Sequence, residues 1–242
     1  MKYPKVIPVL DLMNGEVVHG VAGERDLYRP VVSGLVEGAD PVDISMAFRE
    51  TFGFTEIYIA DLDAIRKQGS NLEHVQRIIE QTNLDVILDY GLLSMEGFDR
   101  LMKSGVKHVI LATETMDSLQ AFGRAVDEYP GSVVGSLDLK EGVVLSKNPI
   151  VREMMPVSVA VELENTDLKR LIVLELSLVG TEKGPIHDAL IDVCDATSMS
   201  IIAGGGVRDP HDLGELEKIG AGEVLVATAL HRRSITPGDL QY

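Results

Sequence analysis

Residues 10–18 read LDLMNGEVV and residues 137–144 read LDLKEGVV, so one short motif occurs twice in the chain. In both copies a glycine follows the aspartate by four positions, and the two aspartates, Asp11 and Asp138, lie 127 residues apart. Each motif begins with an aliphatic run that is typical of a buried strand. The repetition indicates that the chain contains two related halves.

A second pair of segments repeats later in each half. Residues 105–113 read GVKHVILAT and residues 220–228 read GAGEVLVAT, a separation of 115 that also relates Gly91 to Gly206. The separation falls from 127 to 115 because the first half carries about a dozen extra residues, which fit the long stretch 21–40. A constant separation across strand, helix and strand indicates duplication of a whole structural unit.

Short aliphatic runs alternate with amphipathic stretches along the whole chain, which predicts parallel βαβ units. The eight expected strands are Val6–Leu12, Ile57–Leu62, Asp85–Asp89, His108–Ala112, Val133–Leu139, Leu171–Leu176, Ser200–Ala203 and Glu223–Ala227. The expected helices include Leu72–Gln81, Met95–Ser104, Ser118–Tyr129, His187–Ala196 and Asp212–Ile219. Eight units in 242 residues predict one α/β domain, a (βα)8 TIM barrel of residues 1–242. We expect its (βα)4 halves at about residues 1–130 and 131–242, related by a pseudo-two-fold axis.

Composition narrows the classes of partner. The net charge of −16 disfavours nucleic acid and anionic membranes, which reward clustered Lys and Arg. Hydrophobic residues make up 45% of the chain, yet no apolar run approaches the length of a membrane span. The single cysteine, Cys194, allows no internal disulfide, so we expect a reducing, cytoplasmic location.

Chemistry in such barrels sits at the carboxyl ends of the strands. Asp11 and Asp138 hold equivalent positions at the ends of the first and fifth strands, which lie opposite each other in an eight-stranded barrel. Two carboxylates facing one pocket can act as general acid and general base. Alternatively, each carboxylate caps the loop that follows it. We predict a catalytic or substrate-binding role for the pair.

A glycine run follows the seventh strand. Gly204, Gly205 and Gly206 let the backbone approach an anion closely, and Ala227 and Thr228 after the eighth strand can complete a phosphate site. The loops after strands 7 and 8 frequently bind phosphate in barrels, although a plain tight turn is the alternative.

The matching place in the first half reads Asp89-Tyr90-Gly91, with a carboxylate where an anion would lie. We therefore expect no second phosphate site there, and a phosphorylated small molecule as the substrate.

Weaker substrate-binding candidates lie near the predicted mouth. Arg25 and Tyr28 belong to a loop, residues 23–30, that we expect to lie over the barrel, where they offer a cation and a ring face. His19 is a possible base, and Thr113 can bind a substrate hydroxyl or cap the next helix.

Several chemistries lack their residues. The six histidines are scattered with no HxH or HExxH pattern, so we expect no metal, and the glycine run does not extend to a dinucleotide-binding GxGxxG, so we expect no cofactor. No lysine falls within the predicted strand ends, which disfavours a Schiff-base aldolase, although Lys140 follows closely on the fifth strand.

The sequence resembles the barrel family of histidine biosynthesis, which holds phosphoribosylformimino-aminoimidazole-carboxamide ribotide isomerase and the cyclase subunit of imidazole glycerol phosphate synthase. The resemblance covers nearly the whole chain. It rests on Ile7–Leu12 with Gly15 and Val17-Val18, Ala39–Val42, Asp61–Ala64, Ser136–Asp138, Gly180-Thr181 and Gly204–Val207. It implies a barrel of the ribulose-phosphate-binding type. It also implies acid/base roles for Asp11 and Asp138 in an Amadori-type rearrangement or cyclisation of a sugar phosphate.

The chain departs from the family pattern at the sixth strand. The isomerase pattern Thr-Asp-Ile-x-x-Asp-Gly-Thr meets residues 174–181, LELSLVGT, so that Leu174 and Val179 replace polar residues. Glu175 and Ser177 of this segment are further weak substrate-binding candidates. The cyclase has a functional lysine where this chain has His19. These departures predict a divergent paralogue acting on a smaller, singly phosphorylated compound.

Two other functions stay open at this point. One is a synthase or lyase of a coenzyme pathway that keeps the phosphate site. The other is a silent barrel that binds a phosphometabolite or a partner enzyme, which the apolar sixth strand favours. The cyclase works with a glutaminase, but no residue of this sequence identifies a protein partner or a homo-oligomer.

Overall fold

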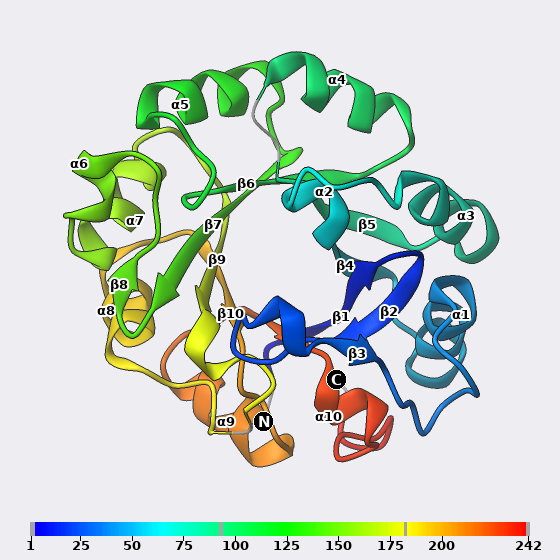
Figure 1. The fold of residues 1–242 in the computed structure, drawn as a ribbon. Coiled ribbons are helices and arrows are strands. Elements are labelled where there is room, and N and C mark those ends of the chain that lie inside the picture. Colours follow the sequence, from blue (N-terminus) through cyan, green and yellow to red (C-terminus); the bar gives the residue numbers. More distant parts are fainter. Residues whose placement is uncertain (1–2, 92–93, 182, 241–242) are drawn as a thin grey trace.

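The computed structural model describes residues 3–91, 94–181 and 183–240, except the side chain of Arg25. Eight parallel strands form a closed barrel in the order β1, β4, β5, β6, β7, β9, β10, β11, and β11 pairs with β1 to complete the circle (Figure 1). Their bounds are β1 Lys5–Met13, β4 Glu56–Asp61, β5 Asp85–Asp89, β6 His108–Ala112, β7 Val133–Lys140, β9 Arg170–Glu175, β10 Ser200–Gly204 and β11 Glu223–Val226. The (βα)8 barrel prediction is confirmed, and each strand lies within two residues of its expected range.

Helices surround the barrel and separate its strands (Figure 1). The expected helices are present as α3 Leu72–Thr82, α4 Met95–Lys103, α5 Leu119–Glu128, α8 Asp188–Ala196 and α9 Pro210–Lys218. The structure adds α1 Pro41–Phe52, α2 Leu62–Ile65, α6 Pro149–Arg152, α7 Pro156–Glu164 and α10 Thr228–His231, with the 3-10 turns η1 Arg25–Leu27 and η2 Leu176–Leu178. No helix in the described ranges is both long and apolar enough to cross a membrane.

Apolar side chains fill the inside of the barrel. Each of the eight strands contributes at least one buried residue to an inner cluster that is separate from the larger core between sheet and helices. These inner residues are Ile7, Tyr58, Ala60, Ile87, Ile110, Ala112, Val134, Ile172, Ile202 and Leu225. Because the lumen is packed at this level, polar side chains must lie above it, at the carboxyl ends of the strands.

The two copies of the repeated motif fold alike. In each, the strand turns back through an antiparallel hairpin, β1 to β2 (Glu16–His19) and β7 to β8 (Val143–Val144). The turns share left-handed backbone angles, with φ of 53° at Asn14 and 81° at Gly15, and 53° at Glu141 and 76° at Gly142. The glycine four residues after each aspartate is therefore required by the turn.

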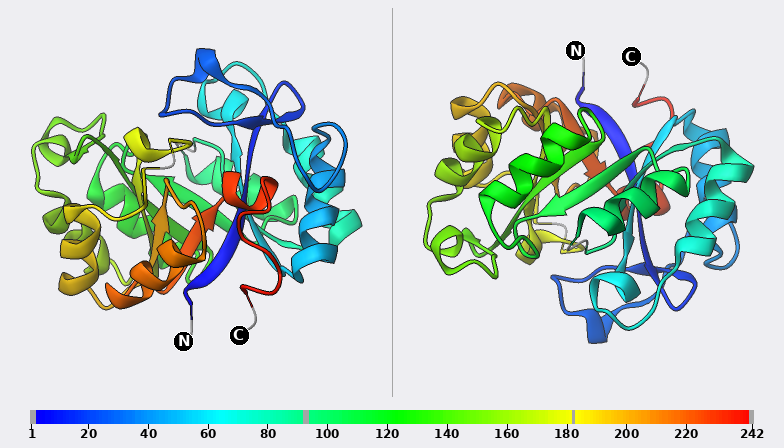
Figure 2. Two further views of the ribbon diagram at one scale, coloured as in Figure 1. Left: turned by 90° about the horizontal axis from the view of Figure 1, so that it is seen from below. Right: turned by 90° about the horizontal axis from the view of Figure 1, so that it is seen from above.

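Residues 20–30, the cover loop, extend from the first hairpin over the mouth. The loop contains η1 and β3 (Arg29–Pro30), and the amide of Ala22 donates a hydrogen bond to the carbonyl of Val179 after β9 at 2.8 Å. Both termini lie at the opposite end of the barrel (Figure 2). The hydrogen bond from Ala22 to Val179 reaches the wall across from β1, which agrees with the expectation that the loop lies over the mouth.

Charged residues close the amino-terminal end of the barrel. Arg170 of β9 donates hydrogen bonds to Glu56 of β4 at 2.9 and 3.0 Å and to Glu223 of β11 at 2.7 and 2.9 Å. Lys5 of β1 donates to Glu56 at 2.8 Å, and His108 of β6 lies 3.7 Å from the same carboxylate. Both glutamates are buried, so this network ties strands together far from the mouth.

Candidate active site

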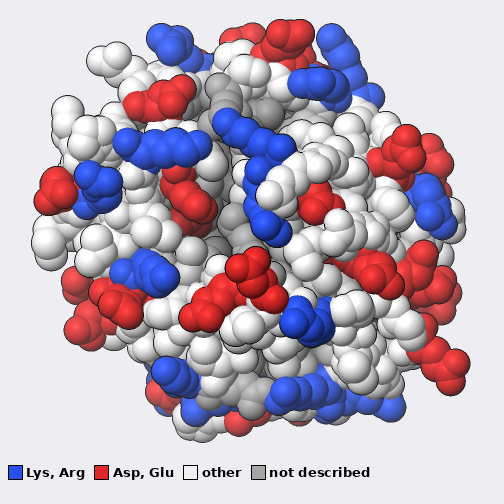
Figure 3. All heavy atoms as spheres, viewed as in Figure 1, with Lys and Arg blue, Asp and Glu red and all other residues white. Residues whose placement is uncertain are grey.

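A cavity of about 530 Å³ opens at the carboxyl ends of the strands. Charged side chains of both signs surround this face of the molecule (Figure 3). Asp26, Arg66, Glu114 and Lys140 line the cavity together with three deeper aspartates, described below. A volume of this size suits a small metabolite.

Asp11 and Asp138 both line this cavity. Asp11 lies on β1 and Asp138 on β7, four strand positions apart in either direction around the barrel, so the two strands are opposite. The register is also equivalent, because Asp11 is level with Ala60 of the next strand and Asp138 with Leu174. The structure thus brings the repeated aspartates to one pocket from opposite walls.

Asp138 is set in a nearly closed environment. Its side chain is buried, the Ser136 hydroxyl donates to Oδ1 at 2.7 Å, and the amide of Glu114 donates to Oδ2 at 3.4 Å. The pKa of Asp138 is raised from 3.8 to about 8, mainly by burial and also by the nearby charges of Asp89 and Glu114, while the hydrogen bonds from the Ser136 hydroxyl and the Glu114 amide oppose the rise. A carboxylic acid with this pKa holds its proton at pH 7 and can donate it.

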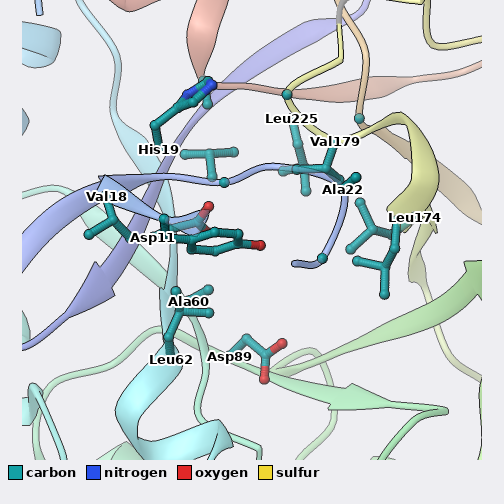
Figure 4. Close-up of a pocket in the computed structure, with 18 of the residues that line it drawn as sticks. Asp11, Val18, His19, Ala22, Ala60, Leu62, Asp89, Leu174, Val179 and Leu225 are labelled. Carbon is teal, nitrogen blue, oxygen red and sulfur yellow. The ribbon is translucent and has the colours of Figure 1, made fainter. Parts of the chain in front are cut away.

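Tyr58 and Asp89 complete the floor of the cavity. The Tyr58 hydroxyl lies 3.5 Å from Oδ2 of Asp89, at the long limit of a hydrogen bond. Burial and the charges of Asp89, Asp11 and Asp138 raise the pKa of Tyr58 well above its ordinary value, so this phenol stays protonated. Figure 4 shows Asp11 and Asp89 on one part of the wall, with Leu174 and Val179 across the cavity.

The glycine run forms a backbone cradle on the other side. Gly205 and Gly206 line the cavity with left-handed φ of 94° and 79°, and a Cβ at Gly206 would lie 2.4 Å from the carbonyl oxygen of Gly184. Among the described residues, neither glycine amide donates a hydrogen bond within the protein. Two such amides are suited to bind an anion.

Three further predicted phosphate residues lie beside this cradle. Ala227 and Thr228 line the cavity at the start of α10. Gly204 ends β10 and does not line it, because a Cβ there would point at Leu174 Cδ1, 2.8 Å away inside the barrel wall. Gly204 therefore allows close packing of β10 against β9 and is not part of the anion site.

The matching turn of the first half is already occupied by the protein itself. Gly91 has a left-handed φ of 59°, as Gly206 does, but its amide donates to Oδ1 of Asp89 at 3.0 Å. Tyr90 takes the place of Gly205 and bonds through its hydroxyl to Ser70 at 2.8 Å. The carboxylate of Asp89 thus acts as a built-in anion. Leu92 and Leu93, the end of this segment, lie outside the described residues.

The weaker candidates separate into two groups. His19 and Tyr28 line the cavity, and burial together with the Arg232 charge lowers the pKa of His19, which favours a neutral imidazole. The side chain of Arg25 is outside the described part of the structure. Arg29 of the same loop folds back onto the backbone carbonyls of Asp26 and Tyr28.

Thr113, Glu175 and Ser177 do not line the cavity. The Thr113 hydroxyl accepts the amide of Asp138 at 3.0 Å, and Glu175 accepts the turn amides of Glu141 and Gly142 at 3.0 and 2.9 Å.

Ser177 donates to Glu175 as well, from both its amide and its hydroxyl. All three side chains thus support the loops around Asp138 and are not placed to meet a substrate.

The sequence analysis missed the role of Tyr58 and placed Lys140 just beyond the end of its strand. Tyr58 reads as one residue of an apolar strand, and only the neighbouring carboxylates give it a polar role. Lys140 lies at the end of β7, two residues beyond Asp138, and so on the same face and within the cavity lining. The strand extends one residue further than expected, which places a lysine at a strand end after all.

One group of possible metal ligands lies elsewhere. Asp209, His211 and Asp212 bring ligand atoms within 4.8 Å of one another at the start of α9. Arg208 already pairs with Asp212 at 2.6 Å. None of these residues lines the cavity, so the group is unrelated to the facing aspartates.

Comparison with known proteins agrees with this architecture. The chain is 32% identical over 235 residues to an uncharacterized protein of Methanocaldococcus jannaschii, covering 94% of this chain and 93% of the relative. It is 31% identical over 234 residues to 1-(5-phosphoribosyl)-5-((5-phosphoribosylamino)methylideneamino) imidazole-4-carboxamide isomerase of Natronomonas pharaonis, covering 96% and 95%. The isomerase of the same name in Halobacterium salinarum is 30% identical over 238 residues, covering 98% and 95%.

The family described as histidine biosynthesis protein matches residues 5–236, which span the barrel from β1 to beyond α10. Because the match includes both hairpins, both facing aspartates and the glycine cradle, the chain belongs to this family.

Proposed function

We propose that this protein is an isomerase that rearranges a singly phosphorylated sugar or sugar amine by acid/base catalysis. The observation that carries the proposal is the placement of Asp11 and Asp138 on opposite walls of one cavity whose rim holds the amides of Gly205 and Gly206. Similarity to isomerases over nearly the whole chain supports the reaction class.

The cradle fixes one end of the substrate. Backbone amides in a left-handed turn point at an anion without any flexible side chain, so a phosphate is held in a defined orientation. Thr228 and the first turn of α10 add donors next to it. A phosphate held here places the rest of a sugar above Tyr58, between the two aspartates.

The aspartates take different roles because their surroundings differ. Asp138 holds its proton at neutral pH and donates it to the ring oxygen of an aldosylamine, which opens the ring to an imine. Asp11 then removes the proton from C2 of the protonated imine, which gives an enaminol. Asp11 returns this proton to C1 while the C2 hydroxyl gives its proton to Asp138, so C2 becomes a ketone, C1 gains a C–H bond and both aspartates regain their starting states. C2 is oxidised while C1 is reduced, so the reaction needs no external oxidant.

The relatives' name describes a substrate with two phosphoribosyl groups. The described part of the chain offers one amide cradle, and at the matching place Asp89 carries its own negative charge to Gly91. A substrate with a single phosphate fits this asymmetry better.

The apolar side chains Leu174, Leu176 and Val179 favour a second function, binding without chemistry. They offer neither a proton nor a hydrogen bond to a reacting sugar. A barrel of this kind would bind sugar phosphates and be stabilised by them without converting them.

One assay separates the two functions. The protein is incubated with the relatives' substrate and with a panel of singly phosphorylated glycosylamines, and products are identified by NMR. We expect conversion of a singly phosphorylated compound, with D11N and D138N slower by about 10²-fold or more. Binding with no product from any compound would reject catalysis, and equal turnover in both variants would reject the assigned residues.

A further inference from the structure

The internal repeat allows the two ends of the cavity to be compared position by position. Asp89 ends β5 and Tyr90 and Gly91 follow it, just as Gly204 ends β10 and Gly205 and Gly206 follow, at the constant separation of 115 residues. The third residue of each turn has a left-handed φ, 59° at Gly91 and 79° at Gly206. The two turns therefore differ by what occupies them and not by their place in the fold.

In the second half the turn is open to the cavity, whereas in the first half a side chain fills it. Asp89 Oδ1 accepts the Gly91 amide at 3.0 Å, which is the donor that corresponds to the Gly206 amide. An external phosphate at this place would have to displace a carboxylate and then lie beside its charge. Both effects oppose a second anion.

The chemistry of Asp89 determines which substrate group can bind next to it. An ionised carboxylate accepts hydrogen bonds and donates none. Asp89 is level with Ala60, which is level with Asp11, so the two carboxylates lie two strands apart, about 10 Å between backbones. The Tyr58 hydroxyl lies between these strands and is held protonated next to Asp89. Asp11 and Asp89 thus bring two carboxylates to this part of the cavity, and Arg66, which follows α2, is the cation among the lining residues next to them.

We propose that Asp89, with Tyr58 beside it, is the specificity-determining residue of this barrel: it closes the first-half anion turn and selects a substrate with a protonated amino group at the end opposite its phosphate. The inference deepens the proposed function and rests on it, because the phosphate must first be held by Gly205 and Gly206.

Two pairs of probes test the proposal by calorimetry at pH 7. Ribulose 5-phosphate and ribulose 1,5-bisphosphate differ by one phosphate, and glucosamine 6-phosphate and glucose 6-phosphate differ by an ammonium in place of a hydroxyl. The variants are D89G, which empties the turn, and D89N, which removes the charge but keeps an acceptor for Gly91. D85N is the control, because Asp85 lies exposed at the other end of the same strand.

The wild type should bind the monophosphate more tightly than the bisphosphate and the amino sugar more tightly than glucose 6-phosphate. D89G should bind the bisphosphate at least about tenfold more tightly than the wild type does, because the freed Gly91 amide can form one new charge-assisted hydrogen bond to the second phosphate. D89N should lose the preference for the amino sugar, and D85N should keep both preferences.

Failure of this proposal and failure of the proposed function look different. If D89G and D89N bind sugar phosphates with the wild-type preferences, Asp89 does not determine specificity although the phosphate cradle stands. If the wild type binds none of the three monophosphates, the cradle itself is wrong, and both proposals fall. D89N keeps the Gly91 contact and so provides the answer if D89G does not fold.

Discussion

The hydroxyl of Ser136 donates a hydrogen bond to Oδ1 of Asp138 over 2.7 Å, inside a pocket where the carboxyl is almost fully buried. The two residues lie on the same face of β7, two positions apart. Burial raises the pKa of Asp138, and this hydrogen bond opposes the rise because it stabilises the ionised form. The pair therefore sets the pH at which the buried acid loses its proton.

Replacing Ser136 with Ala should raise the pKa of Asp138 further above its value of about 8. The hydrogen bond that favours the carboxylate is lost, while the burial that favours the neutral acid remains. Titration of the aspartate carboxyl carbons by ¹³C NMR measures this directly. Ser136→Thr keeps the hydroxyl and should titrate as the wild type does. A pKa that falls in the alanine variant would show that the hydroxyl does not stabilise the ionised form.

Because burial disfavours the ionised form of Asp138, this residue lowers the free energy of unfolding at alkaline pH. The folded-state pKa of about 8 lies above the ordinary 3.8, so the folded protein keeps the proton in a range where the unfolded chain has released it. Stability from this group is complete below about pH 4 and is lost as pH rises to about 8. Each unit of pKa difference corresponds to about 1.4 kcal/mol.

D138N should therefore gain stability relative to the wild type as pH rises from 4 to 8, even though we expect it to lose activity. Urea unfolding at several pH values gives the difference between the two proteins, and that difference should level off above pH 8. Asp85→Asn, an exposed replacement on β5, should follow the wild type throughout. Parallel curves for D138N and the wild type would mean that Asp138 is ionised in the folded protein at neutral pH.

The glycine cradle can be tested without a substrate. Gly206→Ala adds a Cβ that would lie 2.4 Å from the carbonyl oxygen of Gly184 and forces an alanine into a φ of 79°, so the turn must shift. We expect inorganic phosphate, followed by ³¹P NMR or calorimetry, to bind about tenfold more weakly. Gly220→Ala has a similar φ of 85° but nothing within 4 Å of its Cβ, so it controls for backbone strain alone. Equal phosphate affinity in both variants would remove the cradle from the site.

The repeated motif made the fold and the facing aspartates predictable. Side chains alternate between the two faces of a strand, and strands four positions apart lie opposite each other in the barrel. Asp11 and Asp138 hold equivalent positions on two such opposite strands, so both face the pocket. Position along a strand does not reveal which hydrogen bonds are already used. In sequence, Thr113 resembles Thr228 of the second half and Glu175 resembles an acid of the pocket. In the structure, the side-chain oxygens of both accept hydrogen bonds from backbone amides around Asp138.

Helices with weak amphipathic patterns also escaped prediction. The segment Pro156–Glu164 is apolar around most of its circumference, so it lacks the stripe that marks a surface helix. It packs against α5 and α8 as well as β7, which explains the broad apolar surface. Its neighbour Pro149–Arg152 is one turn long and starts at Asn148, whose side chain caps it. Such short helices depend on a cap and a proline more than on a periodic pattern.

The charged network at the closed end of the barrel should govern stability and leave the cavity unaffected. Arg170 donates four hydrogen bonds to Glu56 and Glu223, and both carboxylates are buried. Arg170→Met would leave two buried negative charges without this partner, which typically costs about 3–5 kcal/mol. Chemical unfolding at pH 7 measures the loss, and phosphate affinity of the folded variant should not change.

Acid should reverse part of this defect. Arg170 and Lys5 together hold the pKa of Glu56 below its ordinary value in the wild type, against the opposing effect of burial. The wild type therefore gains stability from Glu56 above its ordinary pKa of 4.5 and loses that gain as pH falls through the lower folded value. Without Arg170, burial favours protonated carboxyls, so the deficit of the variant should shrink from pH 7 towards pH 4. Lys169→Met removes only an exposed pair with Asp167 and should stay close to the wild type, since such pairs contribute little. A deficit that is independent of pH would show that Arg170 stabilises the barrel through packing of its side chain and not through its charge.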